Sequence, residues 1–210
     1  MSAETATGLK RIGVFGGAFD PPHNAHVELA KAALEQFDLS TLYIIPTGQA
    51  WHKARALSAP RHRLAMSRLA FENLPRVVVD ERELQRAGPT FTIDTLQVLQ
   101  AENPQAQLYL FIGADQFSSF RQWHKWHEIL ELAIICIADR AQSTLAQTQF
   151  DAYASHNHRF FTLQLPLMSV SATQVRQLMA LGSASAGEIA QLVPAPVARY
   201  ISLHRLYRSR

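Results

Sequence analysis

The sequence predicts an α/β fold with a mostly parallel, doubly wound sheet, so that helices flank both of its faces. Apolar strand-like segments alternate with helix-like segments along almost the whole chain, and this alternation favours a parallel sheet. Several strand-like segments, such as residues 41–46 (TLYIIP) and 107–113 (QLYLFIG), are continuously apolar. Strands of a parallel sheet have this character because both of their faces are buried. With 48% hydrophobic residues, the 210-residue chain can bury a substantial core.

The expected strands are apolar runs bounded by glycine, proline or charged residues. In chain order they cover residues 12–15, 41–46, 76–80, 107–113, about 132–138 and 159–165. The expected helices are segments between these runs, and one begins at Pro60, a residue suited to a first helical turn. The helices cover residues 24–37, 60 to about 73, 92–102, about 171–181, 185–192 and 195–203.

Three connecting segments have a different character. Residues 81–89 are charged and end in Gly88-Pro89, which predicts a loop whose Arg82, Glu83 and Arg86 lie in solvent. An aromatic segment, residues 117–130, follows the fourth strand, and its Phe117 and Phe120 are expected in the core. Residues 144–155 are ambiguous between a helix and a loop.

The chain is expected to form a single domain over residues 1–210, because it shows no internal repeat, low-complexity tract or interdomain linker. Residues 1–9 are expected to be a loose N-terminal lead-in, and about 171–210 a small C-terminal helical part. The N-terminus lacks the apolar stretch of a signal peptide, and no apolar run reaches the roughly 18 residues of a membrane span. Neither secretion nor a membrane partner is therefore expected.

Cysteine content and charge narrow the partners further. The single cysteine, Cys136, lies in the apolar run LAIICIA, which excludes a disulfide framework and predicts a buried structural thiol in a reducing cytoplasm. Lys and Arg exceed Asp and Glu by 20 to 17, which is compatible with a small anionic substrate. No basic run and no interleaving of basic and aromatic residues points to nucleic acid. The sequence makes no prediction between a monomer and a homo-oligomer.

The first motif, GGAFDPPHNAH, follows the first strand. The apolar run is expected to break at Gly16-Gly17, where glycines let the backbone approach a ligand, and to turn through residues 20–22. His23 and His26 stand three residues apart at the start of the next helix and so share one face. A helix N-terminus favours an anion such as phosphate, to which imidazole N–H groups can donate.

Other interpretations of this motif remain open from the residues alone. The two histidines could be surface side chains at a helix start. A zinc site is weaker, because the usual helical pair is spaced H-E-x-x-H and the sequence has H-x-x-H. A hydride-transferring dinucleotide fold is also weaker, because the turn lacks the G-x-G-x-x-G pattern.

The second motif, SVSATQVR, begins the C-terminal helical part. Ser171 is placed to cap the helix, and Thr173 and Arg176 share a helix face, so a hydroxyl, free N–H groups and a guanidinium could form a second anion site. The alternative is an ordinary capped helix with an outward arginine. Loops after the carboxyl ends of parallel strands meet at one mouth, which is where ligands bind in such sheets. After the first, second, fourth and sixth strands these loops carry residues 16–26, Lys53, 113–115 and 171–176.

Together the two motifs resemble the signatures of the nucleotidyltransferase superfamily, G-x-F-x-P-x-H-x-G-H and I-S-S-T-x-x-R. The middle stretches ERELQRAGPTFTIDTL and FIGADQFSSFRQWHKWHEIL, and the closing PAPVARYISLHRLYR, are similar to bacterial nicotinate-nucleotide adenylyltransferases. The resemblance covers nearly the whole chain. Ala25 stands where the signature has glycine, and Val170 and Ala172 replace its isoleucine and serine.

The resemblance implies a Rossmann-like fold of the nucleotidyltransferase type and a transfer of the adenylyl group of ATP to nicotinate mononucleotide. Catalysis would be positioning and charge stabilisation, because the attacking phosphate is already an anion. His23, His26 and Arg176 are the expected catalytic residues. The ATP-binding set that the resemblance implies is Gly16, Gly17, Phe19, His23, His26, Lys53, Gly113, Asp115, Ser171, Thr173 and Arg176. Mg²⁺ is expected with ATP, held mainly by phosphate oxygens and water, with no dedicated protein metal site.

For the mononucleotide, the resemblance implies that Trp123 stacks on the pyridine ring. Thr90 and Thr92, with backbone N–H groups near them and near His124, would bind the nicotinate carboxylate. The alternative for Trp123 and Trp126 is core packing. Rival functions are a sister enzyme that uses nicotinamide mononucleotide or, less in keeping with the chain length, phosphopantetheine, and a non-catalytic nucleotide-binding module.

Overall fold

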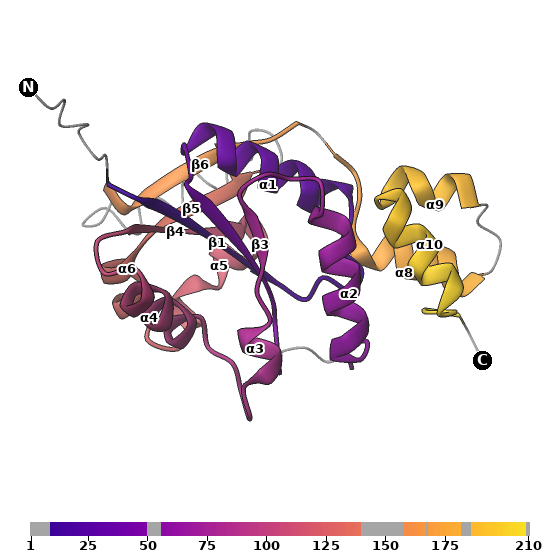
Figure 1. Ribbon diagram of the computed structural model, residues 1–210, viewed down its shortest axis with the longest axis horizontal. Helices are drawn as coiled ribbons and strands as arrows, with labels where there is room; N and C mark the ends of the chain where they lie inside the picture. Colours follow the sequence, from indigo (N-terminus) through magenta and orange to yellow (C-terminus); the bar gives the residue numbers. More distant parts are fainter. Residues whose placement is uncertain (1–8, 50–55, 140–157, 167, 182–185, 209–210) are drawn as a thin grey trace, which may run out of the picture.

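The computed structural model describes residues 9–49, 56–139, 158–166, 168–181 and 186–208. Within these ranges six strands form one sheet in the order β3-β2-β1-β4-β5-β6, with β1 near its centre (Figure 1). All neighbouring strands pair in parallel, so the α/β prediction is confirmed and this sheet is entirely, not mostly, parallel. The strands are β1 (Arg11–Gly17), β2 (Thr41–Pro46), β3 (Val77–Val79), β4 (Gln107–Gly113), β5 (Ala133–Asp139) and β6 (Phe160–Gln164).

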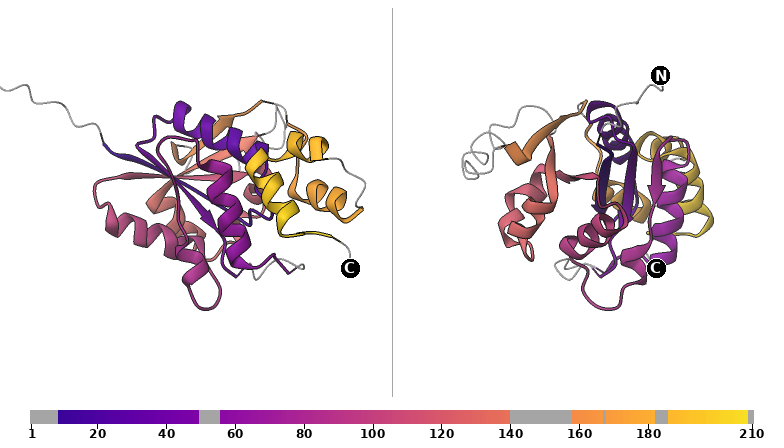
Figure 2. Two further views of the ribbon diagram at one scale, coloured as in Figure 1. Left: turned by 45° about the vertical axis from the view of Figure 1, so that its right-hand side comes forward. Right: turned by 60° about the vertical axis from the view of Figure 1, so that its left-hand side comes forward.

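Helices cover both faces of the sheet (Figures 1 and 2). Helices α1 and α2 pack on one face and α4 to α6 on the other, while α8, α9 and α10 gather beside α2. The described helices are α1 (Asn24–Gln36), α2 (Pro60–Phe71), α3 (Arg82–Gln85), α4 (Thr92–Glu102), α5 (Ala114–Ser118), the 3-10 helix η1 (Phe120–Gln122), α6 (Trp126–Leu132), α8 (Ala172–Leu181), α9 (Ala186–Leu192) and α10 (Ala195–Leu203).

The strands are continuously apolar because each contributes to two cores. In β4, Leu110 and Ile112 pack with α4 to α6, whereas the intervening Phe111 packs with α1 and α2. Cys136 in β5 is fully buried, which confirms the structural thiol, and burial raises its pKa. Phe117 and Phe120 are buried as expected. None of the described helices has both the length and the apolar character needed to cross a membrane.

The prediction that the first strand breaks at Gly16-Gly17 is wrong. Gly16 and Gly17 are the last residues of β1 and pair with Ile45 and Pro46 of β2, because a parallel neighbour extends the strand beyond its apolar run. The chain turns after them, and the residue with a left-handed backbone is Phe19, whose φ is 46°. Burial of the Phe19 ring, which is only 2% exposed, accompanies this conformation.

The predicted loop at residues 81–89 is also wrong in part, since it contains α3. The Asp80 carboxylate accepts a hydrogen bond from the Arg82 N–H at 2.8 Å and another from the Arg82 Nε at 2.7 Å. Asp80 thus satisfies a free N–H group of a single helical turn, and one such contact is easily missed in a charged sequence. The ambiguous segment 144–155 lies outside the described residues.

Helices α8 to α10 extend the core of the α1 and α2 face. Val175, Ile189, Val197 and Ile201 are all buried there. A polar contact joins α10 to α2, where the Tyr200 hydroxyl lies 3.0 Å from His62 Nδ1. The C-terminal helices are therefore attached to α2.

Candidate active site

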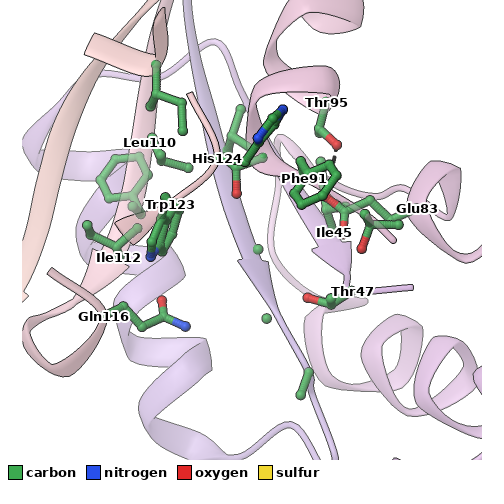
Figure 3. Close-up of a pocket in the computed structure, with 18 of the residues that line it drawn as sticks. Ile45, Thr47, Glu83, Phe91, Thr95, Leu110, Ile112, Gln116, Trp123 and His124 are labelled. Carbon is green, nitrogen blue, oxygen red and sulfur yellow. Dashed lines mark hydrogen bonds between the residues drawn. The ribbon is translucent and has the colours of Figure 1, made fainter. Parts of the chain in front are cut away.

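A pocket of about 430 Å³ lies at the carboxyl ends of β1, β2 and β4, as the topology predicts. Its two walls come from different parts of the chain (Figure 3). Trp123, Leu110 and Gln116 lie on one side of β1, and Phe91, Glu83 and Thr47 lie on the other. The pocket therefore spans the strand that carries the first motif. Of the predicted site residues, it is lined by Gly16, Gly17, Thr90, Thr92, Asp115, Trp123 and His124.

The Trp123 ring faces the pocket and forms its aromatic wall. Its ring centroid is 5.5 Å from that of Phe120, and its backbone N–H donates to the Phe120 carbonyl at 3.0 Å. Next to it, His124 lies over Phe91 with the ring centroids 4.5 Å apart. Trp126 packs partly buried against the core and is not a pocket residue, which agrees with the core-packing alternative for that residue.

Gly16 and Gly17 are glycine for different physical reasons. A Cβ added to Gly16 would meet no atom within 4 Å, whereas one added to Gly17 would lie 3.1 Å from the Phe19 ring. Both residues line the pocket. The absence of a side chain at Gly16 thus keeps pocket space open, while at Gly17 it makes room for a core ring.

A second cluster forms around the start of α1, where His23 is the N-cap. The rings of His23 and His26 stack with centroids 3.6 Å apart and planes 20° apart, as their spacing predicts. The backbone N–H of His23 donates to His26 Nδ1 at 3.1 Å, so Nδ1 carries no hydrogen and Nε2 must carry it. His26 can therefore donate from Nε2 at a helix N-terminus. Ala25, on the same turn, packs partly buried against the core.

The second motif joins this cluster. Ser171 Oγ accepts the Gln174 N–H at 3.2 Å, which confirms the predicted cap. Arg176 donates from Nη2 to Thr173 Oγ1 at 2.9 Å, and from Nη1 to the Asp20 carbonyl at 2.8 Å. The two motifs, 156 residues apart in the sequence, are thus in direct contact.

Two other predicted ATP-site residues, Phe19 and Gly113, are arranged differently. The Phe19 ring is buried against Phe15 and Phe71, so it supports the turn from the core side. Gly113 does not line the pocket, but a Cβ there would come within 2.6 Å of Asp115 Oδ1, so its missing side chain lets that carboxylate fold back. Lys53 lies outside the described residues.

Glu83 was predicted to lie in solvent, but it is a buried pocket residue with 8% of its surface exposed. Thr95 Oγ1 donates to its carboxylate at 2.9 Å, and the Gly48 backbone also hydrogen-bonds to it. Burial raises the pKa of Glu83, and these hydrogen bonds and the nearby Arg86 oppose that shift. The error arose because a charged stretch was read as a solvated loop, whereas α3 turns this one carboxylate inward.

Two further residues, Arg63 and Tyr207, were not predicted for the site at all. Arg63 is 1% exposed and donates to the Ala18 carbonyl at 3.1 Å and to the Ser58 carbonyl at 3.1 Å. Tyr207 donates to the Asp20 carboxylate at 2.6 Å. The sequence offered only weak signals for them: Arg63 is a charged residue on the apolar face of α2, and Tyr207 lies in the closing segment that resembles the family.

Comparison with known proteins places these features in a family. Residues 14–178 match the cytidylyltransferase-like family model. A protein of Albidiferax ferrireducens, named "probable nicotinate-nucleotide adenylyltransferase", is 52% identical over 96% of this chain and 100% of its own length. A protein of Bordetella petrii with the same name is 39% identical over 95% of this chain and 100% of its own length.

Solved structures share the fold. The nicotinic acid mononucleotide adenylyltransferase of Plasmodium falciparum, complexed with NaAD, superposes with a TM-score of 0.77 at 18% identity, over 94% of this chain and 97% of that one. A putative nicotinate-nucleotide adenylyltransferase of Vibrio parahaemolyticus gives a TM-score of 0.68 at 19% identity, over 96% and 98% of the two chains. From its full-length similarity to the curated relatives, the chain belongs to the nicotinate-nucleotide adenylyltransferase family.

Proposed function

We propose that the protein transfers the adenylyl group of ATP to nicotinate mononucleotide, giving nicotinate adenine dinucleotide and pyrophosphate. The observation that carries this proposal is the adjacency of two unlike sites at one edge of the sheet. An apolar and aromatic pocket lies across the end of β1, and two imidazoles at the start of α1 and a guanidinium from α8 gather around the turn that follows this strand. One suits a flat base or pyridine ring, and the other suits phosphates.

The acceptor is proposed to bind between Trp123 and the start of α4. Trp123 offers a flat ring for the pyridine, and Thr90 and Thr92 line the same pocket. Thr92 is the first residue of an eleven-residue helix, whose N-terminal N–H groups favour a negative charge. A carboxylate gains from that field more than an amide does, which supports the acid mononucleotide over its amide.

The phosphates are proposed to bind at the start of α1. The mononucleotide phosphate attacks the α-phosphorus of ATP, and the bond to the pyrophosphate oxygen breaks. His26 donates from Nε2, and Arg176 adds a fixed positive charge near the same turn. Both stabilise the charge that develops on pyrophosphate, and no proton has to be removed from the attacking group.

Magnesium is proposed as part of the ATP substrate. The part of the chain that the structure describes has no cluster of three or more His, Cys, Asp or Glu side chains that could hold a metal ion. Mg²⁺ commonly takes most of its ligands from substrate phosphates and water. The role left to the described residues is to orient the phosphates that carry it.

The test is an assay of pyrophosphate release with ATP and either the acid or the amide mononucleotide, on the wild type and on His26→Ala. We expect the acid to be used far more efficiently, and His26→Ala to lower kcat by about 100-fold or more while the circular dichroism spectrum stays unchanged. His204→Ala, at an exposed histidine after α10, is the control and should match the wild type.

Each other result has a defined meaning. A preference for the amide would support the nicotinamide mononucleotide alternative. A lack of product with both mononucleotides, with ATP binding intact, would support the non-catalytic module. Unchanged turnover in His26→Ala would contradict the role given to this histidine.

A further inference from the structure

Asp20, in the turn between β1 and α1, is held by three segments that are distant in the sequence. Its carboxylate accepts the Tyr207 hydroxyl at 2.6 Å and the Ser58 N–H at 3.1 Å, and its carbonyl accepts Arg176 Nη1 at 2.8 Å. The residue is 1% exposed. A buried carboxylate with specific donors from separate elements defines one position for the turn that leads into His23.

Tyr207 is the contact that comes from the end of the chain. It follows α10 and has a left-handed backbone, with a φ of 65°, which turns the side chain back toward the site. Burial and the neighbouring Asp20 carboxylate both raise the pKa of Tyr207. The hydroxyl therefore stays protonated near neutral pH and remains a donor.

The hydroxyl also determines what Arg176 can do. Arg176 contacts the carbonyl of Asp20, so its guanidinium lies beside the residue whose carboxylate Tyr207 binds. If a buried carboxylate loses a donor, it needs another, and a neighbouring guanidinium is the strongest one. Among the described residues, two guanidiniums are near Asp20: the buried Arg63, which interacts electrostatically with its carboxylate, and Arg176, which contacts its carbonyl. Without the Tyr207 hydroxyl, the Asp20 carboxylate would draw on both and would compete with phosphate for Arg176.

We propose that Tyr207 is a positioning residue for the nucleotide phosphates. Its hydroxyl fixes the Asp20 carboxylate, keeps Arg176 available for phosphate, and sets the entry of the chain into His23 and His26. The role rests on the proposed adenylyl transfer, and it makes the C-terminal segment part of the ATP site through Asp20 and Arg176.

The experiment compares Tyr207→Phe with Tyr200→Phe. Both changes remove one hydroxyl that links the C-terminal helical part to the rest of the protein, but Tyr200 contacts His62 of α2 and not the turn. The measurements are the affinity for a non-hydrolysable ATP analogue by calorimetry, the KM for each substrate, kcat, and the thermal unfolding midpoint. Asp20→Asn and the double variant Tyr207→Phe/Asp20→Asn complete a double-mutant cycle on this contact.

In Tyr207→Phe we expect the ATP-analogue affinity to fall about 10-fold, which is the effect of one lost hydrogen bond to a charged group. The KM for the mononucleotide should stay within about twofold. Tyr200→Phe should bind the analogue as the wild type does, with a similar unfolding midpoint. The double variant should lose less affinity than the sum of the two single losses, because both changes act on the same hydrogen bond: Tyr207→Phe removes it, and Asp20→Asn removes its charge.

Equal analogue affinities in Tyr207→Phe and Tyr200→Phe would overturn the inference, and so would additive losses in the double variant. If Tyr207→Phe does not fold, Asp20→Asn alone decides, since unchanged analogue affinity there contradicts the role of the contact. The proposed function fails separately, if the wild type forms no dinucleotide product. The analogue affinities still compare the two tyrosines in that case.

Discussion

The two neighbouring glycines at the end of β1 face different surroundings: Gly16 faces the open pocket, and Gly17 faces a ring of the core. In Gly16→Ala the new Cβ would enter pocket space without meeting protein atoms, and in Gly17→Ala it would press on the Phe19 ring. We expect Gly16→Ala to keep the wild-type unfolding free energy and to raise a substrate KM by about 10-fold, because the methyl group displaces ligand.

Gly17→Ala is the matched variant on the adjacent residue. It should lose about 1–3 kcal/mol of unfolding free energy, because the Phe19 ring must shift within a packed core. Urea denaturation and steady-state kinetics on both variants measure the two effects. Wild-type kinetics in Gly16→Ala would show that no substrate occupies the space beside that residue.

At the scale of single elements, α3 depends on one carboxylate. The Asp80 carboxylate accepts the N–H of Arg82, the first helical residue, and also pairs with its guanidinium, and the side chains of both residues are at most 17% exposed. Asp80→Ala should therefore lower the unfolding free energy by about 1–2 kcal/mol and raise the KM for the mononucleotide, since α3 holds Glu83 against the pocket.

Glu81→Ala, at the next residue, provides the control. Glu81 pairs with Arg68 at 3.5 Å, but these side chains are 39% and 58% exposed. Such a pair contributes little, so the change should cost below about 0.5 kcal/mol and leave both KM values unchanged. Equal losses of unfolding free energy in the two variants, measured by urea denaturation, would show that the hydrogen bond from Arg82 to Asp80 does not stabilise α3.

Elements with a long, continuous signal were predictable from the sequence, and contacts between distant segments were not. The bounds of β4, α4 and α10 are as predicted, because apolar periodicity and flanking breakers coincide there. The starts of α1 and α8 were also predicted, since the signals for a helix start are local. The roles given to their residues in binding and catalysis stay predictions.

The missed residues have partners that local patterns do not reveal. The Arg63 contact to Ala18 spans 45 residues, and the Tyr207 contact to Asp20 spans 187. Spacing along the chain carries no signal for such pairs, because the fold of the whole sheet brings them together. Glu83 was misplaced for a related reason, as its burial depends on Thr95 and Gly48 from other elements.

At the scale of the whole molecule, the two proposed binding regions are held by different elements. The aromatic wall with Trp123 follows β4, and the histidine and arginine cluster is held by α1, α8 and the tail after α10. The proposed reaction needs both, but each should fail separately when its own support is changed.

Trp123→Ala tests this separation. Loss of a stacking ring should raise the KM for nicotinate mononucleotide by about 10- to 100-fold, because base-type stacking contributes about 1–3 kcal/mol. The affinity for a non-hydrolysable ATP analogue, measured by calorimetry, should stay within about twofold, since the histidine and arginine cluster proposed to bind phosphate is unchanged. Trp126→Ala is the control: this ring packs against Phe120 outside the pocket, so its loss should lower stability without changing either affinity. If Trp123→Ala weakens the analogue and spares the mononucleotide, the pocket binds adenine, and the two substrates must be exchanged between the two regions.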